Sequence, residues 1–255
     1  MRRRILELAF GGAEHGAHIA PALSIVEIMA VLYLYAMKND HASSDEFVLS
    51  KGHGALAYYT ALCEADCLSR DLLATYEENG GRLPGQPPKA RDLGIPYAGG
   101  SLGLGLSFAC GLSLSNRMLK KGGRVYVLLG DGELNEGTVW ESAIFAGHQK
   151  LADLTAIVDR NSMQSDGPTE EVLKLDIPAL WKSCGWHVIE CDGHDVESLA
   201  AAFDSPAVDG PTAIVAETVK GKGVSFMERN NEWHHNRISS QQLDEALAEL
   251  DGTKC

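Results

Sequence analysis

Strand-like and helix-like segments alternate regularly between residues 124 and 218, and this alternation limits the fold more than any other feature of the sequence. The strand-like runs cover residues 124–130, 154–159, 186–191 and 211–218, with helical stretches at 137–150, 177–184 and 196–203. The runs are almost wholly apolar, as expected for strands that are buried on both faces. We therefore predict an α/β fold in which a parallel sheet has helices on both faces.

The rest of the chain is predicted to be mainly helical, with one long loop. Helices are expected over residues 21–37, 55–65, 101–120 and 241–250. Residues 80–100 are rich in glycine and proline and are predicted to form a loop. This loop is longer than a simple connector, which makes it a candidate active-site segment. Because we find no repeats or linkers, we treat residues 1–255 as a single domain.

Composition and charge argue against several classes of partner. The net charge of −13 disfavours binding to nucleic acid and to anionic membranes. No run of 18 apolar residues occurs, and the N-terminus lacks the apolar core of a signal peptide. The six cysteines form no CxxC pair. Cys63 and Cys67 are spaced as half of a metal site, but two buried thiols are the favoured interpretation. We expect a cytoplasmic protein.

The first strand of the alternating region ends in Gly130-Asp131-Gly132. Two glycines let the backbone turn sharply and approach a ligand closely. A carboxylate at this position could bind a hard metal ion, while the amides of the following turn could bind phosphate oxygens. Alternatively, Asp131 could simply cap the next helix, and the tripeptide alone does not decide between these roles.

Asn161 lies 30 residues after Asp131, at the end of the next strand. One strand–helix–strand unit separates the two residues, so we expect both at the same edge of the sheet. Their oxygens, a backbone carbonyl and two phosphate oxygens would supply the ligands that Mg²⁺ prefers, with Ca²⁺ or Mn²⁺ as alternatives. A Gly-Asp-Gly followed some thirty residues later by asparagine is the thiamine diphosphate signature.

The segment from Gly130 to Gly167 resembles the cofactor motif of transketolases, most closely in the N-terminal subunit of split bacterial and archaeal enzymes. The likeness extends over residues 18–33, 49–59, 83–87, 99–111 and 220–236. It implies the thiamine diphosphate-binding fold known as the PP-type domain, and transfer of a two-carbon ketol unit between sugar phosphates.

The resemblance also assigns site residues. It implies that Asp131, Asn161 and the main-chain carbonyl of Met163 hold the metal. It places Glu136 in a relay that joins the two cofactor sites of the family's dimers. Further cofactor-binding residues implied by the resemblance are Gly103, Leu104, Gly130, Gly132 and Glu133.

Three histidines fall in matched motifs. The resemblance implies that His53 and His234 contact phosphates or substrate and that His18 faces the sugar. Each could instead be a hydrogen-bonded surface histidine. We assign His234 in preference to its neighbour His235, because family members more often read Trp-His-Gly there. No role is expected for His15, His41, His148, His187 and His194.

The chain departs from the family where the sugar should bind. The family usually has a histidine in the sequence LPGHP, where this chain has Gln86. An amide forms hydrogen bonds but does not titrate. Residues 14–21, EHGAHIAP, also differ from the commoner GSGHIGGS. Both departures argue against the ordinary pentose phosphates as substrates and leave the cofactor site intact. A transketolase specialised for a branched or a sulfonated sugar is an alternative, and the sequence does not name the sugar.

In transketolases, the carboxylate and the aromatic side chains around the aminopyrimidine ring come from a pyrimidine-binding domain. We expect this domain and the C-terminal domain on a separate partner subunit, in an α₂β₂ assembly. Two alternatives remain open, an α subunit of a 2-oxo-acid dehydrogenase and a catalytically silent scaffold protein. The sequence disfavours a dinucleotide site, because Gly103 and Gly105 follow no strand.

Overall fold

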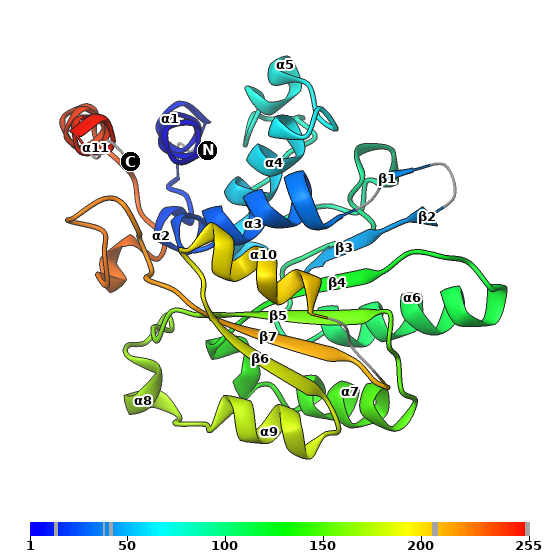
Figure 1. The fold of residues 1–255 in the computed structure, drawn as a ribbon. Helices are drawn as coiled ribbons and strands as arrows, with labels where there is room; N and C mark the ends of the chain where they lie inside the picture. The colour runs from blue at the N-terminus through cyan, green and yellow to red at the C-terminus, as the bar shows by residue number, and fades with distance from the viewer. Residues whose placement is uncertain (13–14, 38, 41–42, 206–208, 253–255) are drawn as a thin grey trace.

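The computed structural model describes residues 1–12, 15–37, 39–40, 43–205 and 209–252. Its centre is a five-stranded sheet in the order β3-β4-β5-β7-β6, in which every neighbouring pair is parallel (Figure 1). The strands are β3 (Glu46–Leu49), β4 (Val125–Gly130), β5 (Leu154–Arg160), β6 (His187–Asp192) and β7 (Thr212–Glu217). The predicted parallel sheet is therefore confirmed, and β4 and β5 are neighbours within it.

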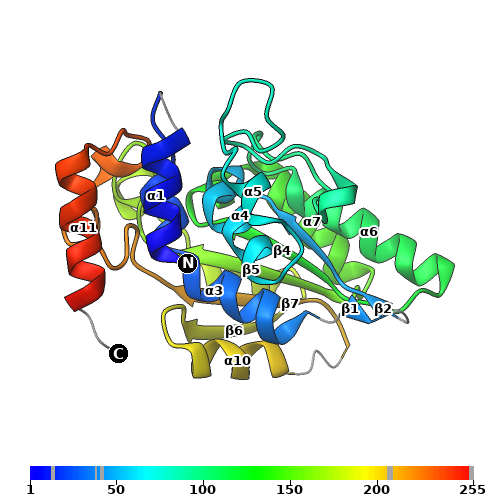
Figure 2. The ribbon, with the colours of Figure 1, turned by 90° about the horizontal axis from the view of Figure 1, so that it is seen from above.

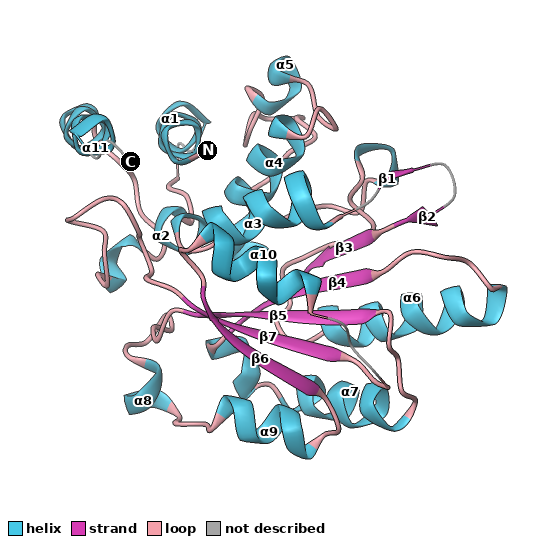
Figure 3. Cartoon of the chain, viewed as in Figure 1, coloured by secondary structure: helices cyan, strands magenta, loops and turns pink. Residues whose placement is uncertain are grey.

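Helices cover both faces of this sheet (Figure 3). On one face lie α2 (Ile19–Leu23), α3 (Val26–Val31), α4 (Ala55–Glu64) and α10 (Val196–Asp204); on the other lie α6 (Gly105–Leu119), α7 (Gly137–His148) and α9 (Ile177–Ser183). Strand residues alternate between the two layers. Tyr126 and Leu128 belong to one hydrophobic cluster, and Val125, Val127 and Leu129 to the other.

The two ends of the chain lie side by side, outside one helical layer. Helix α1 (Arg2–Gly12) packs along α11 (Ser240–Gly252) (Figure 2). An ion pair between Arg3 and Asp251 joins them. No helix in the described part of the chain is long and apolar enough to cross a membrane.

The edge strand β3 was not predicted. Its four residues are too few to give a periodic pattern, and it pairs on one side only, with β4. Its hydrogen bonds are to β4, a strand about eighty residues later in the sequence, and no local pattern reveals this pairing. The small elements β1 (Asn39–Asp40), β2 (Ser43–Ser44), α5 (Arg70–Leu73) and α8 (Thr169–Val172) were also not predicted.

The helix predicted over residues 21–37 is broken into three pieces, so this prediction was wrong. Helix α2 ends before Ser24, α3 follows, and a π-helical turn, η1 (Leu32–Ala36), completes the segment. The Ser24 hydroxyl lies within hydrogen-bond distance of the carbonyl oxygen of Pro21 (3.0 Å) and of Asp159 Oδ2 (2.8 Å), which share its single proton. Competition from these side-chain bonds explains why the helix breaks here.

The other predicted elements differ in their bounds only. Helix α6 begins at Gly105, four residues later than predicted. The loop over residues 80–100 contains one 3₁₀ turn, η3 (Arg91–Leu93). Three further 3₁₀ turns are η2 (Gly52–Gly54), η4 (Gly132–Asn135) and η5 (Asn231–Trp233).

Candidate cofactor and metal site

The carboxyl ends of β4 and β5 bring Asp131 and Asn161 together. The register pairs Gly130 with Asp159, and the amide of Asp131 donates to the carbonyl oxygen of Asp159 (3.2 Å). Both side chains therefore leave the sheet at the same edge, as predicted from their spacing. They line a cavity of about 130 Å³. Other predicted residues that line it are His53, Gly130, Gly132, Glu133, Met163 and His234.

Asp131 is buried and held by main-chain amides. Its Oδ1 accepts from the amide of Gly132 (2.8 Å) and its Oδ2 from the amide of Ser162 (2.7 Å). Burial, together with the charge of Asp159, raises the pKa of Asp131 to about 6. A cation beside this carboxylate would offset that cost, so the environment of Asp131 suits a metal ion.

Asn161 is also buried, and both atoms of its amide are engaged. Nδ2 donates to Asp159 Oδ2 (2.8 Å), and Oδ1 accepts from the amide of Met163 (3.1 Å). Carboxylate and amide oxygens are hard ligands that suit Mg²⁺. In the described residues no cluster of three or more His, Cys, Asp or Glu side chains could hold a metal alone. Oxygens of a bound phosphate would therefore complete the ligand set.

Two buried lysines supply positive charge, and our sequence analysis missed both. Lys220 lines the cavity, and its Nζ donates to the carbonyl oxygen of Gln164 (3.2 Å) and to Asn231 Oδ1 (3.0 Å). Burial, with Lys51 nearby, lowers the pKa of Lys220 to about 8. Lys51 is fully buried and forms an ion pair with Asp159 (2.5 Å). Lys220 follows the strand predicted at residues 211–218 and precedes a glycine, which marks a candidate position, but the burial that gives both lysines their role follows from tertiary structure.

Glu133 lies in the cavity wall, but its carboxylate faces protein donors. It accepts from the Ser50 hydroxyl (2.5 Å) and from the amides of Gly103 (2.8 Å) and Gly130 (3.2 Å). Burial is the main cause of a raised pKa for Glu133. The contacts show that Glu133 connects the glycine loop before α6 to the ends of β3 and β4.

The turn before α6 separates two leucines. Gly103 has a φ of +83°, and a Cβ there would lie 2.6 Å from Thr138 Oγ1, so this position requires glycine. Leu102 lines the cavity, whereas Leu104, the predicted residue, is 44% exposed and does not line it. Glu136 is exposed at the start of α7, also outside the cavity.

Four histidines form one cluster at the edge of the cavity. The ring of His18 lies 5.9 Å from His53, 5.4 Å from His234 and 4.6 Å from His235, between ring centroids. Paired main-chain hydrogen bonds between Ala17 and Asn236 bring the two segments together. His53 and His234 line the cavity, while His235 packs against His18.

Burial lowers the pKa of three of these imidazoles, those of His18, His53 and His234. Burial, with the charge of His235, lowers the pKa of His18 to about 4. Burial, with the charge of Lys220, lowers the pKa of His234 to about 3. Burial is also the main cause of a strongly lowered pKa for His53. Nδ1 of His234 is buried and has no hydrogen-bond partner among the described residues, so it is available to a ligand.

These lowered pKa values predict how stability depends on pH. Below the ordinary pKa of 6.5 the unfolded chain binds protons that the folded cluster does not. The free energy of unfolding should therefore fall as pH drops from 6.5 to about 4. Urea unfolding at several pH values measures this. His18→Gln should reduce the dependence, and His187→Gln, at an exposed position on β6, should leave it unchanged. An equal dependence in all three proteins would contradict the prediction.

The remaining histidines lie outside the cavity wall. His194 bridges Glu27 Oε2 (2.9 Å) and the amide of Val219 (2.8 Å). His148 and His187 are exposed. His41 lies outside the described residues. Cys63 and Cys67 are free thiols and belong to no metal-binding cluster in the described structure. Cys63 is buried as expected, but Cys67 is exposed, so the prediction of two buried thiols was wrong for Cys67.

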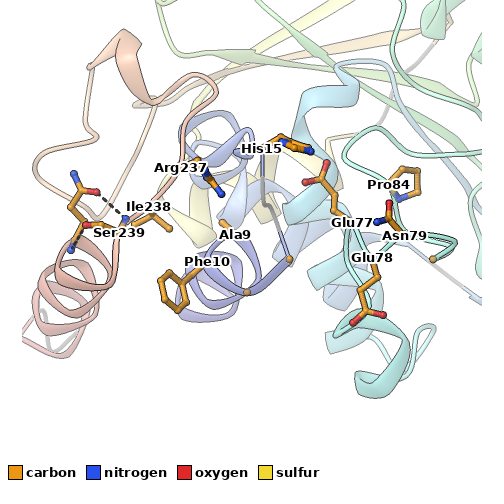
Figure 4. Close-up of a pocket in the computed structure, with 14 residues that line it drawn as sticks. Ala9, Phe10, His15, Glu77, Glu78, Asn79, Pro84, Arg237, Ile238 and Ser239 are labelled. Atoms are coloured by element: carbon orange, nitrogen blue, oxygen red, sulfur yellow. Dashed lines mark hydrogen bonds between the residues drawn. The ribbon is translucent and has the colours of Figure 1, made fainter.

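A larger groove of about 890 Å³ lies between the end of α1, the loop around residues 77–84 and the start of α11 (Figure 4). His15 and Glu77 lie next to each other in it. Burial raises the pKa of Glu77, and nearby His235 and His15 offset part of the increase. The groove therefore adjoins the histidine cluster.

Gln86 packs against the turn that bears His53. A Cβ on Gly52 would lie 2.2 Å from Gln86 Oε1, so the amide fills the space beside this glycine. Gln86 Oε1 is buried and has no hydrogen-bond partner among the described residues. The side chain thus lies next to the histidine cluster, where the sequence analysis expected the sugar.

The sheet is parallel, and the ends of two neighbouring strands supply carboxylate and amide oxygens beside buried lysines and a glycine turn. This arrangement is that of an α/β domain suited to binding a diphosphate. The family described as "Transketolase, thiamine diphosphate binding domain" matches residues 3–251. The chain belongs to this family, and its sheet and cofactor class are those that the resemblance implied. The match favours transketolase over the 2-oxo-acid dehydrogenase alternative.

Comparison with individual proteins supports the same family. The chain is 38% identical to one subunit of the apulose-4-phosphate transketolase of Actinobacillus succinogenes, over 98% of this chain and 93% of the relative. It is also 38% identical to the SqwG subunit of the 6-deoxy-6-sulfo-D-fructose transketolase of a Clostridium species, over 92% and 88%. Human transketolase is 38% identical over 98% of this chain but only 41% of its own length. Transketolase from Leishmania mexicana superposes with a TM-score of 0.89 at 27% identity, covering 98% of this chain and 40% of that one.

Proposed function

We propose that this chain is the diphosphate-binding subunit of a heteromeric transketolase that transfers a two-carbon ketol unit between sugar phosphates. The observation that supports this most directly is one cavity lined by Asp131, Asn161, Lys220, His53 and His234. The chain also matches relatives named as transketolase subunits along almost their whole length. The five free thiols among the described residues suit a reducing cytoplasm, where we place the enzyme.

The cavity residues fit a metal-bound diphosphate. The side chains of Asp131 and Asn161 and the main-chain carbonyl of Met163 would hold Mg²⁺. Lys220 would neutralise part of the diphosphate charge. Thiamine diphosphate, when bound, supplies the electron sink that ketol transfer requires. The neutral imidazoles of His53 and His234 can donate and accept hydrogen bonds, and so can orient a sugar hydroxyl.

Exposed apolar side chains on α7 and just before α6 support the proposal of a partner subunit. Ile144 and Phe145 on α7 are 61% and 41% exposed, and Leu104, the residue before α6, is 44% exposed. Large apolar side chains exposed in this way suit a protein interface. Glu136 is exposed at the start of α7, where a partner could reach it. We propose a partner that carries the pyrimidine-binding and C-terminal domains, in an α₂β₂ assembly.

Reconstitution tests this function. The chain and a candidate partner should together transfer a ketol unit between sugar phosphates, and the activity should require both thiamine diphosphate and Mg²⁺. Tight cofactor binding without turnover on any ketose would indicate the silent scaffold protein instead.

Gln86 provides a way to identify the class of sugar substrate. Relatives at the same 38% identity are named for apulose 4-phosphate, for a sulfonated fructose and simply as transketolase, so identity does not choose among sugars. A mismatched sugar leaves a buried polar group unpaired, which costs about 1–3 kcal/mol. We propose that Gln86 adapts the site to a sugar other than the ordinary pentose phosphates.

Gln86→His should therefore raise kcat/KM for xylulose 5-phosphate relative to the native donor, by about 5- to 150-fold. A panel of ketose phosphates, assayed with the reconstituted complex, measures this ratio. Gln86→Asn keeps the amide and serves as the control, and cofactor affinity should be the same in all three proteins. Equal substrate profiles for the wild type and Gln86→His would refute the proposal.

A further inference from the structure

A fully buried carboxylate lies directly behind the cavity. Asp159 has no exposed surface and is not part of the cavity wall. Its Oδ2 accepts from Lys51 Nζ (2.5 Å), Ser24 Oγ (2.8 Å) and Asn161 Nδ2 (2.8 Å), and its Oδ1 accepts from the Thr218 hydroxyl. The donors come from separate segments of the chain, so the position of Asp159 is strongly constrained.

These contacts allow the Asn161 amide only one orientation. In the observed one, Nδ2 donates to Asp159 and Oδ1 accepts from the amide of Met163. Turning the amide by 180° would place Oδ1 against a carboxylate oxygen and Nδ2 against an N–H group. Both contacts would then lack the hydrogen-bond complementarity that they now have. Asp159 is the stronger of the two restraints, because it is charged.

The orientation of the Asn161 amide decides which of its atoms can coordinate a metal ion. An amide oxygen coordinates a hard cation, whereas an amide nitrogen that carries its hydrogens does not. Nδ2 is directed at the buried Asp159, whereas Oδ1 has a second lone pair besides the one that accepts from Met163, so Oδ1 is the amide atom that can serve the cavity that Asn161 lines.

We propose that Asp159 is a positioning residue that keeps the oxygen of Asn161 available to a divalent cation. The proposal rests on the metal site proposed above. Lys51 balances the charge of Asp159, so that the carboxylate can lie behind Asp131 without adding a second uncompensated negative charge.

Two matched double variants isolate this effect. Removing either charge alone would leave the other buried and unpaired, which is strongly destabilising. K51M/D159N contains no buried charge in the pair and still offers an amide oxygen to Asn161 Nδ2. K51M/D159L is also uncharged but offers no acceptor. Replacing a buried ion pair with uncharged side chains is often tolerated, so both proteins should fold.

Calorimetric titration of Mn²⁺ in the presence of thiamine diphosphate, with the full chain assembled with its partner, measures the consequence. K51M/D159L should bind Mn²⁺ about 10- to 100-fold more weakly than K51M/D159N, as for other partners that orient a metal ligand. Adding Asn161→Asp to both backgrounds should abolish the difference, because a carboxylate presents an oxygen in either orientation. Equal affinities without Asn161→Asp, or a difference that persists with it, would overturn the proposal.

A second measurement needs no metal. In chain labelled with ¹⁵N-asparagine, the Nδ2 hydrogens of Asn161 should exchange slowly with water in K51M/D159N and quickly in K51M/D159L. Equal exchange in the two variants would overturn the proposed positioning. Failure of the wild type to bind Mn²⁺ would instead refute the metal site, and the exchange rates would still decide whether Asp159 orients the amide.

Discussion

Replacing Asp131 with alanine is expected to lower the affinity for thiamine diphosphate and Mg²⁺ by more than about 100-fold. Losing a group that only orients a metal ligand typically costs 10- to 100-fold, and Asp131 would be a ligand itself. Asn161→Ala should act in the same direction but less strongly, because a neutral ligand contributes less to binding a cation. Calorimetry with the reconstituted complex measures both.

Measuring the stability of Asp131→Ala distinguishes a role of Asp131 in metal binding from a role in folding. Burial raises the pKa of Asp131 to about 6, so at pH 7 the ionised carboxylate is less stable in the folded chain than in the unfolded chain. Asp131→Ala should therefore unfold at the same or a higher urea concentration than the wild type, without cofactor. Asp166→Ala, an exposed carboxylate in the loop after β5, should change neither property. Unaltered cofactor affinity in Asp131→Ala would remove the metal role.

The purified chain without a partner subunit should show no ketol transfer above background. The described residues that line the cavity include no Phe, Tyr or Trp, although the aminopyrimidine of the cofactor requires an aromatic pocket in this family. The cavity of about 130 Å³ is also smaller than the roughly 300–1,000 Å³ of typical ligand pockets. We propose that it holds the diphosphate end of the cofactor and that a partner subunit encloses the rest.

Activity should appear only when a partner is added, and should saturate at one partner per chain. The assay is ketol transfer over a range of partner concentrations at fixed chain concentration, with the partner alone as the control. Turnover by the purified chain without any partner would show that the split-enzyme proposal is wrong.

The central part of the site could be predicted because its information is local. Gly130, Asp131 and Gly132 are consecutive, and Asn161 lies one strand–helix–strand unit later. In a parallel sheet this spacing fixes both the edge and the neighbouring strand. For the same reason the strands of the alternating region were predicted correctly.

What could not be predicted depends on contacts between distant segments. The helix break at Ser24 is linked to a bond with Asp159, 135 residues away. The roles of Lys51 and Lys220 depend on their burial, which their sequence neighbours do not reveal. Leu102 lines the cavity and Leu104 does not, because the left-handed backbone of Gly103 directs the two side chains apart. Each of these follows from tertiary structure and not from a local pattern.

The four residues after β3 have an evolutionary consequence. Ser50 binds Glu133, Lys51 binds Asp159, Gly52 packs on Gln86, and His53 lines the cavity. Three consecutive positions thus contact three different residues and the fourth lines the cavity, with no spare residue between them. A single inserted or deleted codon would misalign all four positions at once, whereas a substitution disturbs one. This stretch should therefore accept point changes far more readily than changes in length, and genes that diverge in substrate should keep its length fixed.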